Sequence, residues 1–418
     1  MHHKTVLDNG IRIITEKLDH FRSVSLGIWV SVGSRDEMEE ENGISHFIEH
    51  MIFKGTRART SLQIAKELDA IGGLSNAFTG TEYTCFHAKV LDEHLLRLAE
   101  ILSDIFLNST FDPQEMNRER QVILQEINLV EDTPDEQIHV LFNRLFWMNH
   151  PLGMPILGTP KSVSNISKES IVDYVGRFYT PERILVAAAG HVDHDQLVGY
   201  FRPLFERLEP SRQDLPRVAP EAHAAVSCHF KELEQVHLCL GGKAPPLSSE
   251  RRYPAAVLNT ILGGNMSSRL FQEIREKRGL AYSVYSFLSA YLDAGLLGIC
   301  LGTDPRHINR SLKVIQKEIQ AIQKGGISQA DLEATKEHLI GGILLSAENT
   351  DTRMTRLAKN AAVFGRYISY EELIVDLEKV TVDDVVGVAR DAFQSKDLTL
   401  ATLGAVREED LDLECLQF

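Results

Sequence analysis

The sequence lacks long hydrophobic runs. Its longest apolar candidate, Ile184 to Ala189, has the length of a strand, whereas a helix that crosses a bilayer needs about 20 apolar residues. Residues Met1 to Thr5 contain no apolar stretch of the kind that opens a signal peptide. We therefore expect no membrane association and a cytoplasmic location.

Cysteines are few, and basic residues are outnumbered by acidic ones. The five cysteines are scattered and no two have C-x-x-C spacing, which is typical of reduced thiols rather than of a disulfide framework. Lysine and arginine number 44 against 59 aspartates and glutamates, so the formal net charge is −15. An acidic chain repels nucleic-acid phosphates, so we expect no nucleic-acid partner and a preference for cationic partners such as basic peptides.

The 418 residues contain an internal repeat. Three segments recur in the same order: 111–116 with 327–332, 166–172 with 380–386, and 184–190 with 398–404. Their offsets are nearly constant, since 327 − 111 = 216, 380 − 166 = 214 and 398 − 184 = 214. Such a repeat indicates two copies of one domain of about 200 residues. A proline-containing stretch divides the copies, which predicts a first domain at 1–208, a linker at 209–225 and a second domain at 226–418.

Strands and helices are mixed within each copy. In the first copy, segments rich in Ile and Val predict strands at 10–14 and 24–32, and 75–90 is expected to form paired strands. Helical periodicity predicts helices at 43–53, 62–71, 95–107 and 113–130. Because the two kinds of element do not alternate regularly, we expect an α+β fold. Each domain should hold a largely antiparallel sheet packed with helices.

The most informative motif is His46-Phe47-Ile48-Glu49-His50. Residues four apart on a helix lie above one another, so His46 and His50 can share one metal ion. Glu49 projects near the same face as a candidate general base, and the order H-x-x-E-H is that of the inverzincins. The alternative interpretation is a pair of surface histidines on an amphipathic helix.

A catalytic zinc site usually has three protein ligands, so a third is expected on another element. Glu119 and Glu126 lie seven residues apart on one face of a predicted helix, although a solvated, salt-bridged face beside Arg118 and Arg120 is the alternative. At an offset of 216 these two acids align with Thr335 and Gly342, and no histidine pair appears around 257–262. Metal chemistry is therefore expected in the first copy alone.

Residues 42–56, which enclose the histidine motif, resemble the pitrilysin/insulinase family of zinc peptidases. The likeness is greatest to its processing-peptidase branch, whose active members resemble the β subunit of mitochondrial processing peptidase. In that family the third ligand is a glutamate at a characteristic spacing after the second histidine, which the resemblance places on Glu126 here, since 126 − 50 = 76. A further family glutamate matches Glu119 as a supporting residue. The resemblance covers essentially the whole chain and implies one Zn²⁺ per chain and two homologous domains that enclose a cleft.

The same resemblance implies two substrate-binding elements. Residues 73–79 resemble an edge strand to which substrate adds as an extra strand, with Asn76, Ala77 and Phe78 as binding residues. Residues 267–282 resemble a segment with a paired arginine and tyrosine, which places those roles on Arg275 and Tyr282. Without the resemblance these segments would be a plain sheet strand and a charged helix followed by an aromatic strand.

The predicted function is a zinc-dependent endopeptidase that hydrolyses extended or unfolded peptides in a chamber between two domains. Glu49 would be the general base, and the acidic run 36–41 could attract basic substrates, unless it is simply a solvated loop. The short segment 262–265 stands where the inactive α subunit of the mitochondrial enzyme has a long glycine-rich loop. A free-standing enzyme, with a homodimer left open, is therefore favoured over a non-proteolytic or partner-dependent peptide-binding subunit and over a non-peptidase zinc hydrolase.

Overall fold

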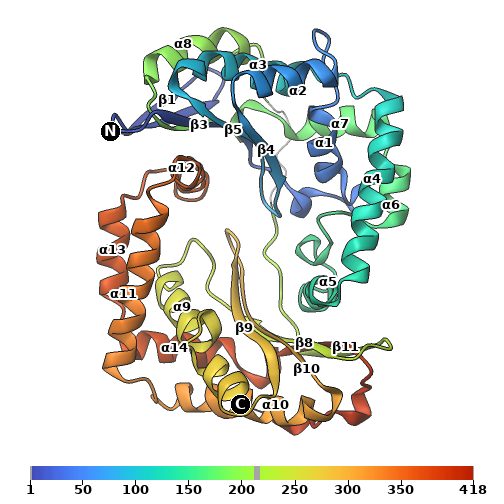
Figure 1. Cartoon of the computed structure of the whole chain (residues 1–418), viewed down its shortest axis with the longest axis vertical. Helices are drawn as coiled ribbons and strands as arrows, with labels where there is room; N and C mark the ends of the chain where they lie inside the picture. The colour runs from blue at the N-terminus through green and yellow to red at the C-terminus, as the bar shows by residue number, and fades with distance from the viewer. Residues whose placement is uncertain (1, 211–216, 418) are drawn as a thin grey trace. The chain divides into compact units, whose positions relative to one another are not determined.

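The structure, a computed structural model, describes residues 2–210 and 217–417. The chain forms two compact units, each built around one sheet (Figure 1). The first unit contains the residues up to Leu129, Met154–Arg217 and Ser346–Tyr367. The second contains Val130–Gly153, Val218–Leu345 and the residues from Ile368 onward. Part of the predicted linker, 211–216, lies outside the described residues.

The sheet of the first unit has the strand order β1-β2-β6-β3-β5-β4 over the described residues. Its strands are β1 (His2–Val6), β2 (Arg12–Lys17), β3 (Ser23–Val30), β4 (Leu74–Thr79), β5 (Thr84–Leu91) and β6 (Ile184–Gly190). Only the β2–β6 pair is parallel among these described strands, and the other pairs are antiparallel. The predicted α+β class with a largely antiparallel sheet is thereby confirmed for this unit.

Both faces of this first sheet are buried. Along β6, Ile184, Val186 and Ala188 enter one hydrophobic cluster, while Leu185, Ala187 and Ala189 enter the cluster on the other face. Side chains alternate between the faces of a strand, and a strand buried on both faces therefore reads as one continuous apolar run. This burial explains why Ile184 to Ala189 is the most apolar stretch of the sequence.

The sheet of the second unit has the order β7-β11-β8-β10-β9 over the described residues. Its strands are β7 (Ala225–Phe230), β8 (Val236–Lys243), β9 (Ala281–Ala290), β10 (Gly295–Thr303) and β11 (Thr399–Gly404). The β7–β11 pair is parallel and the other described pairs are antiparallel. The second sheet therefore also matches the predicted class.

The helices recur at the offsets of the sequence repeat. Those in the first half are α1 (Ile44–Ile52), α2 (Ser61–Ala70), α3 (Leu95–Asn108), α4 (Pro113–Asp132), α5 (Pro134–Phe146), α6 (Pro160–Asn165), α7 (Lys168–Phe178) and α8 (His194–Phe205). Those in the second half are α9 (Arg252–Asn259), α10 (Ile308–Gln323), α11 (Gln329–Ser346), α12 (Thr350–Phe364), α13 (Tyr370–Glu378) and α14 (Val382–Ala392). The starts of α4 and α11 differ by 329 − 113 = 216, those of α5 and α12 by 350 − 134 = 216, and those of α7 and α14 by 382 − 168 = 214.

Helices α5 and α12 are exchanged between the two halves of the sequence. Helix α12 packs on the first sheet, where Met354, Leu357 and Ala358 join Trp29 in one hydrophobic cluster. Helix α5 packs on the second sheet through β8 and β11. The compact units consequently do not follow the chain order, and the division at 209–225 stays a prediction about the repeated sequence.

The cysteines require a correction. Cys239 on β8 and Cys300 on β10 are joined in a disulfide, while Cys85, Cys228 and Cys415 are free. The expectation of reduced thiols throughout was wrong for this pair, because the antiparallel register of β8 and β10 places the two residues directly opposite each other. None of the helices in the described ranges is both long and apolar enough to cross a membrane.

Candidate metal centre

Helix α1 carries the histidine motif on one face and core residues on the other. Its apolar positions, at spacings of three and four, are Ile44, Phe47, Ile48, Met51 and Ile52, and all of them enter the core of the first unit. His46, Glu49 and His50 follow the same spacing on the remaining face. The predicted range 43–53 is therefore helical almost to its ends.

The start of α1 is held by a buried carboxylate. Gly43 precedes the helix with φ +92°, and a Cβ there would lie 2.8 Å from the Cα atom of Gly158, so glycine is required. The carboxylate of Glu37 accepts the Gly43 N–H at 2.8 Å, the Ser45 N–H at 2.9 Å and a hydrogen from Asn42 Nδ2 at 3.1 Å. Burial raises the pKa of Glu37 to about 7, against the opposing effect of these hydrogen bonds.

The acidic run 36–41 is thus only partly a solvated loop. Glu37 is 3% exposed, and the carboxylate of Asp36 accepts hydrogen bonds from Arg217. Glu41 pairs with Arg177, whereas Glu39 and Glu40 face solvent. Asp36, Glu37 and Glu41 thus make contacts inside the unit, and an attraction of basic substrates by this run stays a prediction.

The structure brings His46, His50 and Glu126 together. Glu126 Oε2, from α4, lies 3.6 Å from His46 Nε2 and 3.6 Å from His50 Nε2. One ligand atom from each of the three residues lies within 4.8 Å of the others. A tetrahedral zinc ion at 2.0–2.1 Å from its donors separates them by about 3.4 Å, so this nitrogen and oxygen set fits the ion.

The protonation of His46 suits a metal ligand. Burial, with a smaller effect of neighbouring His50, lowers the pKa of His46 to about 4. The imidazole is therefore neutral near neutral pH and keeps a lone pair for a cation.

Glu119 orients the His50 ring through the nitrogen that does not face Glu126. This glutamate on α4 is 7% exposed, and its carboxylate accepts a hydrogen bond from His50 Nδ1 at 3.1 Å. It also pairs with Lys54 Nζ at 2.6 Å, which compensates its buried charge. Donation through Nδ1 leaves Nε2 of His50 as the unprotonated nitrogen that faces Glu126.

Glu49 is half-buried and interacts with Thr79, His50 and Glu126. Burial raises its pKa, and hydrogen bonding to Thr79 on β4 opposes the rise. A carboxylate whose pKa is raised holds a proton more readily than an exposed glutamate, which suits a group that accepts a proton and passes it on.

Asn76, Ala77 and Phe78 lie on β4, which is an outer strand of the first sheet over the described residues. Asn76 is exposed, and its Oδ1 accepts the N–H of Ala77. The ring of Phe78 instead packs edge-on against Trp29, with 5.4 Å between ring centroids. Of the three, only Asn76 presents its side chain mainly to solvent.

Arg275 and Tyr282 belong to the second unit and contact each other. Arg275 lies on a π-helical turn, Phe271–Glu276, and Tyr282 lies on β9. The guanidinium carbon of Arg275 is 4.8 Å from the centroid of the Tyr282 ring, which is a cation–π contact. Tyr282 is 79% exposed, so the face of its ring away from Arg275 is open to solvent.

Three further residues support the centre and were missed by sequence reasoning. They are Glu37 at the start of α1, Lys54 beside Glu119 and Thr79 beside Glu49. Lys54 lies four residues after His50 and just beyond the end of α1 at Ile52, so this spacing was an available signal. Glu37 and Thr79 carried no signal in the sequence, because their partners are reached only through loops and strand pairing.

Comparisons with known proteins give one consistent result. The family model "Insulinase (Peptidase family M16)" matches residues 12–160, and "Peptidase M16 inactive domain" matches residues 165–339. The chain is 42% identical over 395 residues to "Uncharacterized zinc protease YmxG" of Bacillus subtilis (strain 168), covering 94% of this chain and 96% of the relative. It is 38% identical to "Uncharacterized zinc protease SCO5738" of Streptomyces coelicolor, covering 97% of this chain and 90% of the relative.

Two solved structures share the fold. A protease from Helicobacter pylori superposes with a TM-score of 0.90 at 22% identity and covers 97% of this chain and 99% of its own. A peptidase M16 inactive domain from Pseudomonas fluorescens gives a TM-score of 0.90 at 18% identity, with 97% and 98% covered. At these identities the likeness concerns the fold.

Proposed function

The chain belongs to the insulinase family of peptidases, family M16, and from this membership we propose that it is a zinc-dependent endopeptidase acting on extended or unfolded peptides. Its class as a zinc protease rests on whole-length relatives at 42% and 38% identity. The proposal goes beyond this class in two respects, namely endopeptidase action and a preference for extended or unfolded peptides.

The observation that carries the proposal is the meeting of α1 and α4. Two imidazole nitrogens from α1 and one carboxylate oxygen from α4 converge, although their residues are far apart along the chain. Zn²⁺ held by His46, His50 and Glu126 would polarise the scissile carbonyl and lower the pKa of a water molecule. One ion per chain follows, because the second copy has Thr335 and Gly342 where the first has Glu119 and Glu126.

The protein groups have distinct roles in the proposed reaction. Glu49 takes a proton from the attacking water and passes it to the leaving amine. Glu119 keeps His50 in the tautomer that presents Nε2, and Lys54 balances the charge of Glu119.

The β4 strand is the proposed docking element for substrate. An outer strand has unpaired N–H and C=O groups, so an extended peptide can add to it by backbone hydrogen bonds. Backbone pairing favours unfolded substrates and depends weakly on their sequence. Asn76, exposed on this strand, is the side chain best placed to contact such a peptide.

The remaining finer statements rest on the family resemblance. They are the likeness to the β subunit of mitochondrial processing peptidase, a chamber between the two homologous domains, and roles for Arg275 and Tyr282 toward substrate. A preference for basic peptides, a cytoplasmic location and a homodimer are likewise proposals. The domain division at 209–225 is also a proposal.

Elemental analysis combined with a peptidase assay on the lone purified chain tests this function. We expect about one zinc per chain, hydrolysis of quenched fluorescent peptides and casein, loss of activity on chelation, and recovery on adding Zn²⁺. Zinc bound without hydrolysis of any peptide would instead identify a peptide-binding or partner-dependent subunit. Hydrolysis that survives complete metal removal would refute the metal mechanism.

A further inference from the structure

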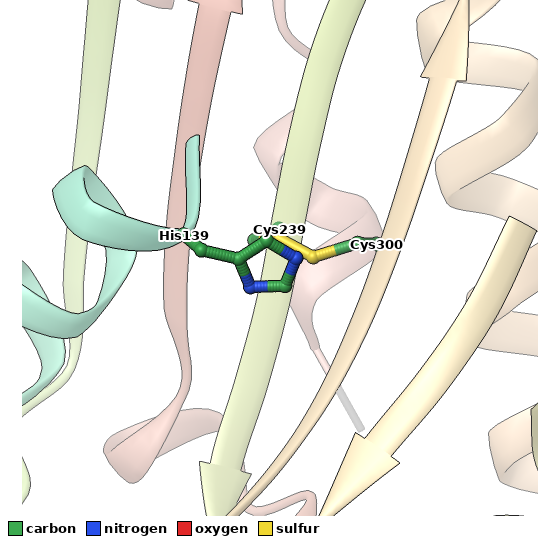
Figure 2. Close-up of side chains that lie close together, drawn as sticks. All are labelled: His139, Cys239 and Cys300. Atoms are coloured by element: carbon green, nitrogen blue, oxygen red, sulfur yellow. A yellow bond between two sulfur atoms is a disulfide. The ribbon is translucent and has the colours of Figure 1, made fainter. Parts of the chain in front are cut away.

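A second group of side chains of metal-ligating types lies in the second unit. Cys239 on β8 and Cys300 on β10 are directly opposite each other, with Cα atoms 4.4 Å apart. Figure 2 shows the imidazole of His139, from α5, lying against the two sulfurs. One ligand atom from each of these three residues lies within 4.8 Å of the others.

The two cysteines of this group are buried among apolar side chains, and His139 is partly exposed. Cys239 is 0% and Cys300 3% exposed, in a hydrophobic cluster that includes Phe142 and Leu296. His139 is only half-buried, and its Nε2 lies 2.6 Å from the hydroxyl of Tyr285, which is 36% exposed. His139 and Tyr285 are therefore the members of this group nearest to solvent, while the two cysteines are buried.

The donor set is one that zinc prefers. Two thiolates and one imidazole form the protein part of some four-coordinate zinc sites, with the fourth position left for water or another donor. Soft sulfur ligands also select Zn²⁺ and Cu⁺ over Mg²⁺ and Ca²⁺.

We propose that His139, Cys239 and Cys300 form a redox-gated metal site that binds a thiolate-preferring cation such as Zn²⁺ when reduced and is closed when oxidised. The two states exclude each other because they use the same sulfur atoms. In the disulfide the sulfurs are bonded together, whereas two sulfurs at about 2.3 Å from one tetrahedral ion are about 3.7 Å apart. The site is independent of the proposed peptidase function, since it shares no residue with the centre on α1 and α4.

Reduction of the Cys239–Cys300 disulfide by a phosphine frees both sulfurs for a cation. A water-soluble phosphine attacks one sulfur and breaks the S–S bond, and the other sulfur leaves as a thiolate. Water then hydrolyses the phosphonium intermediate, so the phosphine becomes its oxide and both cysteines become thiols. Binding of the cation displaces the thiol protons to solvent. A phosphine is preferred to a dithiol because it competes less for the metal.

Cobalt titration of the whole chain tests the site. The chain is compared oxidised and after phosphine reduction without denaturant, under anaerobic conditions. We expect the reduced chain to bind one Co²⁺ more than the oxidised chain. This extra ion should show sulfur-to-cobalt charge-transfer absorption, which the His46, His50 and Glu126 set cannot produce because it contains no sulfur. Added Zn²⁺ should remove that absorption.

Variants assign the absorption to these residues. Cys239→Ser should abolish it, and His139→Gln should weaken Co²⁺ binding at least about tenfold. Cys228→Ser, a free cysteine of the same unit, is the matched control and should leave the absorption unchanged. Absorption that persists in Cys239→Ser would overturn the assignment.

Thiol protection in the wild-type chain gives a test that needs no variant. Zn²⁺ should shield two of the five thiols of the reduced native protein from alkylation, and peptide mapping should identify them as Cys239 and Cys300. Equal alkylation of these two with and without Zn²⁺ would refute the proposal. Failure of the phosphine to reduce the pair before the protein unfolds would refute it as well.

Discussion

Replacing Glu37 by glutamine tests how the start of the ligand-bearing helix α1 is held. The wild-type carboxylate is 3% exposed and accepts the N–H groups of Gly43 and Ser45. Burial raises its pKa to about 7 from 4.5. The phenols of Tyr174 and Tyr179 also face Glu37, but burial raises their own pKa values, so both stay neutral across the range considered.

The sign of the effect follows from proton binding. The unfolded chain releases the Glu37 proton near pH 4.5, whereas the folded protein keeps it up to about pH 7. Between these values the folded state binds more protons, so the free energy of unfolding falls as the pH rises. The contribution is fully present below pH 4.5 and is lost as the pH passes about 7.

The expected size is measurable. With these two pKa values, the wild-type protein should lose about 2.5 kcal/mol of stability relative to Glu37→Gln between about pH 5 and 8. Glutamine does not titrate, and groups common to both proteins cancel in the difference. Helix α1 should also be less well capped in the variant, because an amide offers one acceptor oxygen instead of two.

The two tryptophans allow each unit to be followed separately. Trp29 lies on β3 of the first unit and Trp147 lies in the second. In a Trp147→Phe background, denaturant unfolding followed by Trp29 fluorescence at several pH values reports the unit that contains Glu37. Glu40→Gln, an exposed glutamate of the same acidic run, is the control and should show no pH-dependent difference.

Two results would refute this reasoning. A difference between wild type and Glu37→Gln that does not change with pH would show that the carboxyl has an ordinary pKa. A wild type that gains stability with rising pH, relative to the variant, would show that the hydrogen bonds to the carboxylate outweigh the cost of burying its charge.

Three further substitutions test the proposed site. Glu49→Gln should keep zinc but lower kcat by about 10²–10⁴-fold, while the exposed Glu131→Gln on α4 should change neither; equal turnover in Glu49→Gln would remove its assigned role. Glu119→Gln should weaken Zn²⁺ binding about 10–100-fold, as measured by competition with a chelator. An unchanged Zn²⁺ affinity would show that Glu119 does not orient His50. Tyr282→Phe should preserve the stack on Arg275 and lower kcat/KM by about 10²–10³-fold if the hydroxyl meets the developing oxyanion, so full activity would exclude that contact.

Local patterns predicted the elements of the first half well. The range 113–130 anticipates α4 at Pro113–Asp132, and 95–107 anticipates α3 at Leu95–Asn108. Helix α1 was predicted equally well, because its apolar positions and its His and Glu positions each follow helical spacing. These predictions succeeded because periodicity depends only on neighbours along the chain.

Contacts between segments far apart in the sequence could not be predicted in the same way. Glu37 belongs to the acidic run that was interpreted either as attracting basic substrates or as a solvated loop, yet its carboxylate is buried against the start of α1. The exchange of α5 and α12 between the two sheets was also unforeseen, since an amphipathic helix does not specify which apolar face it covers. Cys239 and Cys300 carry no pairing signal across 61 residues.

The amino-acid sequence alone determined the repeated α+β architecture, the histidine and glutamate spacing on each helix, and the absence of acidic ligands from the second copy. Those features depend only on residue type and on the spacing of residues within one helix or strand. Only the tertiary structure decided that Glu126 Oε2 lies 3.6 Å from both imidazoles, that Glu37 caps α1 and that His139 lies against a cysteine pair. The physical reason is that such distances are set by helix packing and strand register, which bring together groups far apart along the chain.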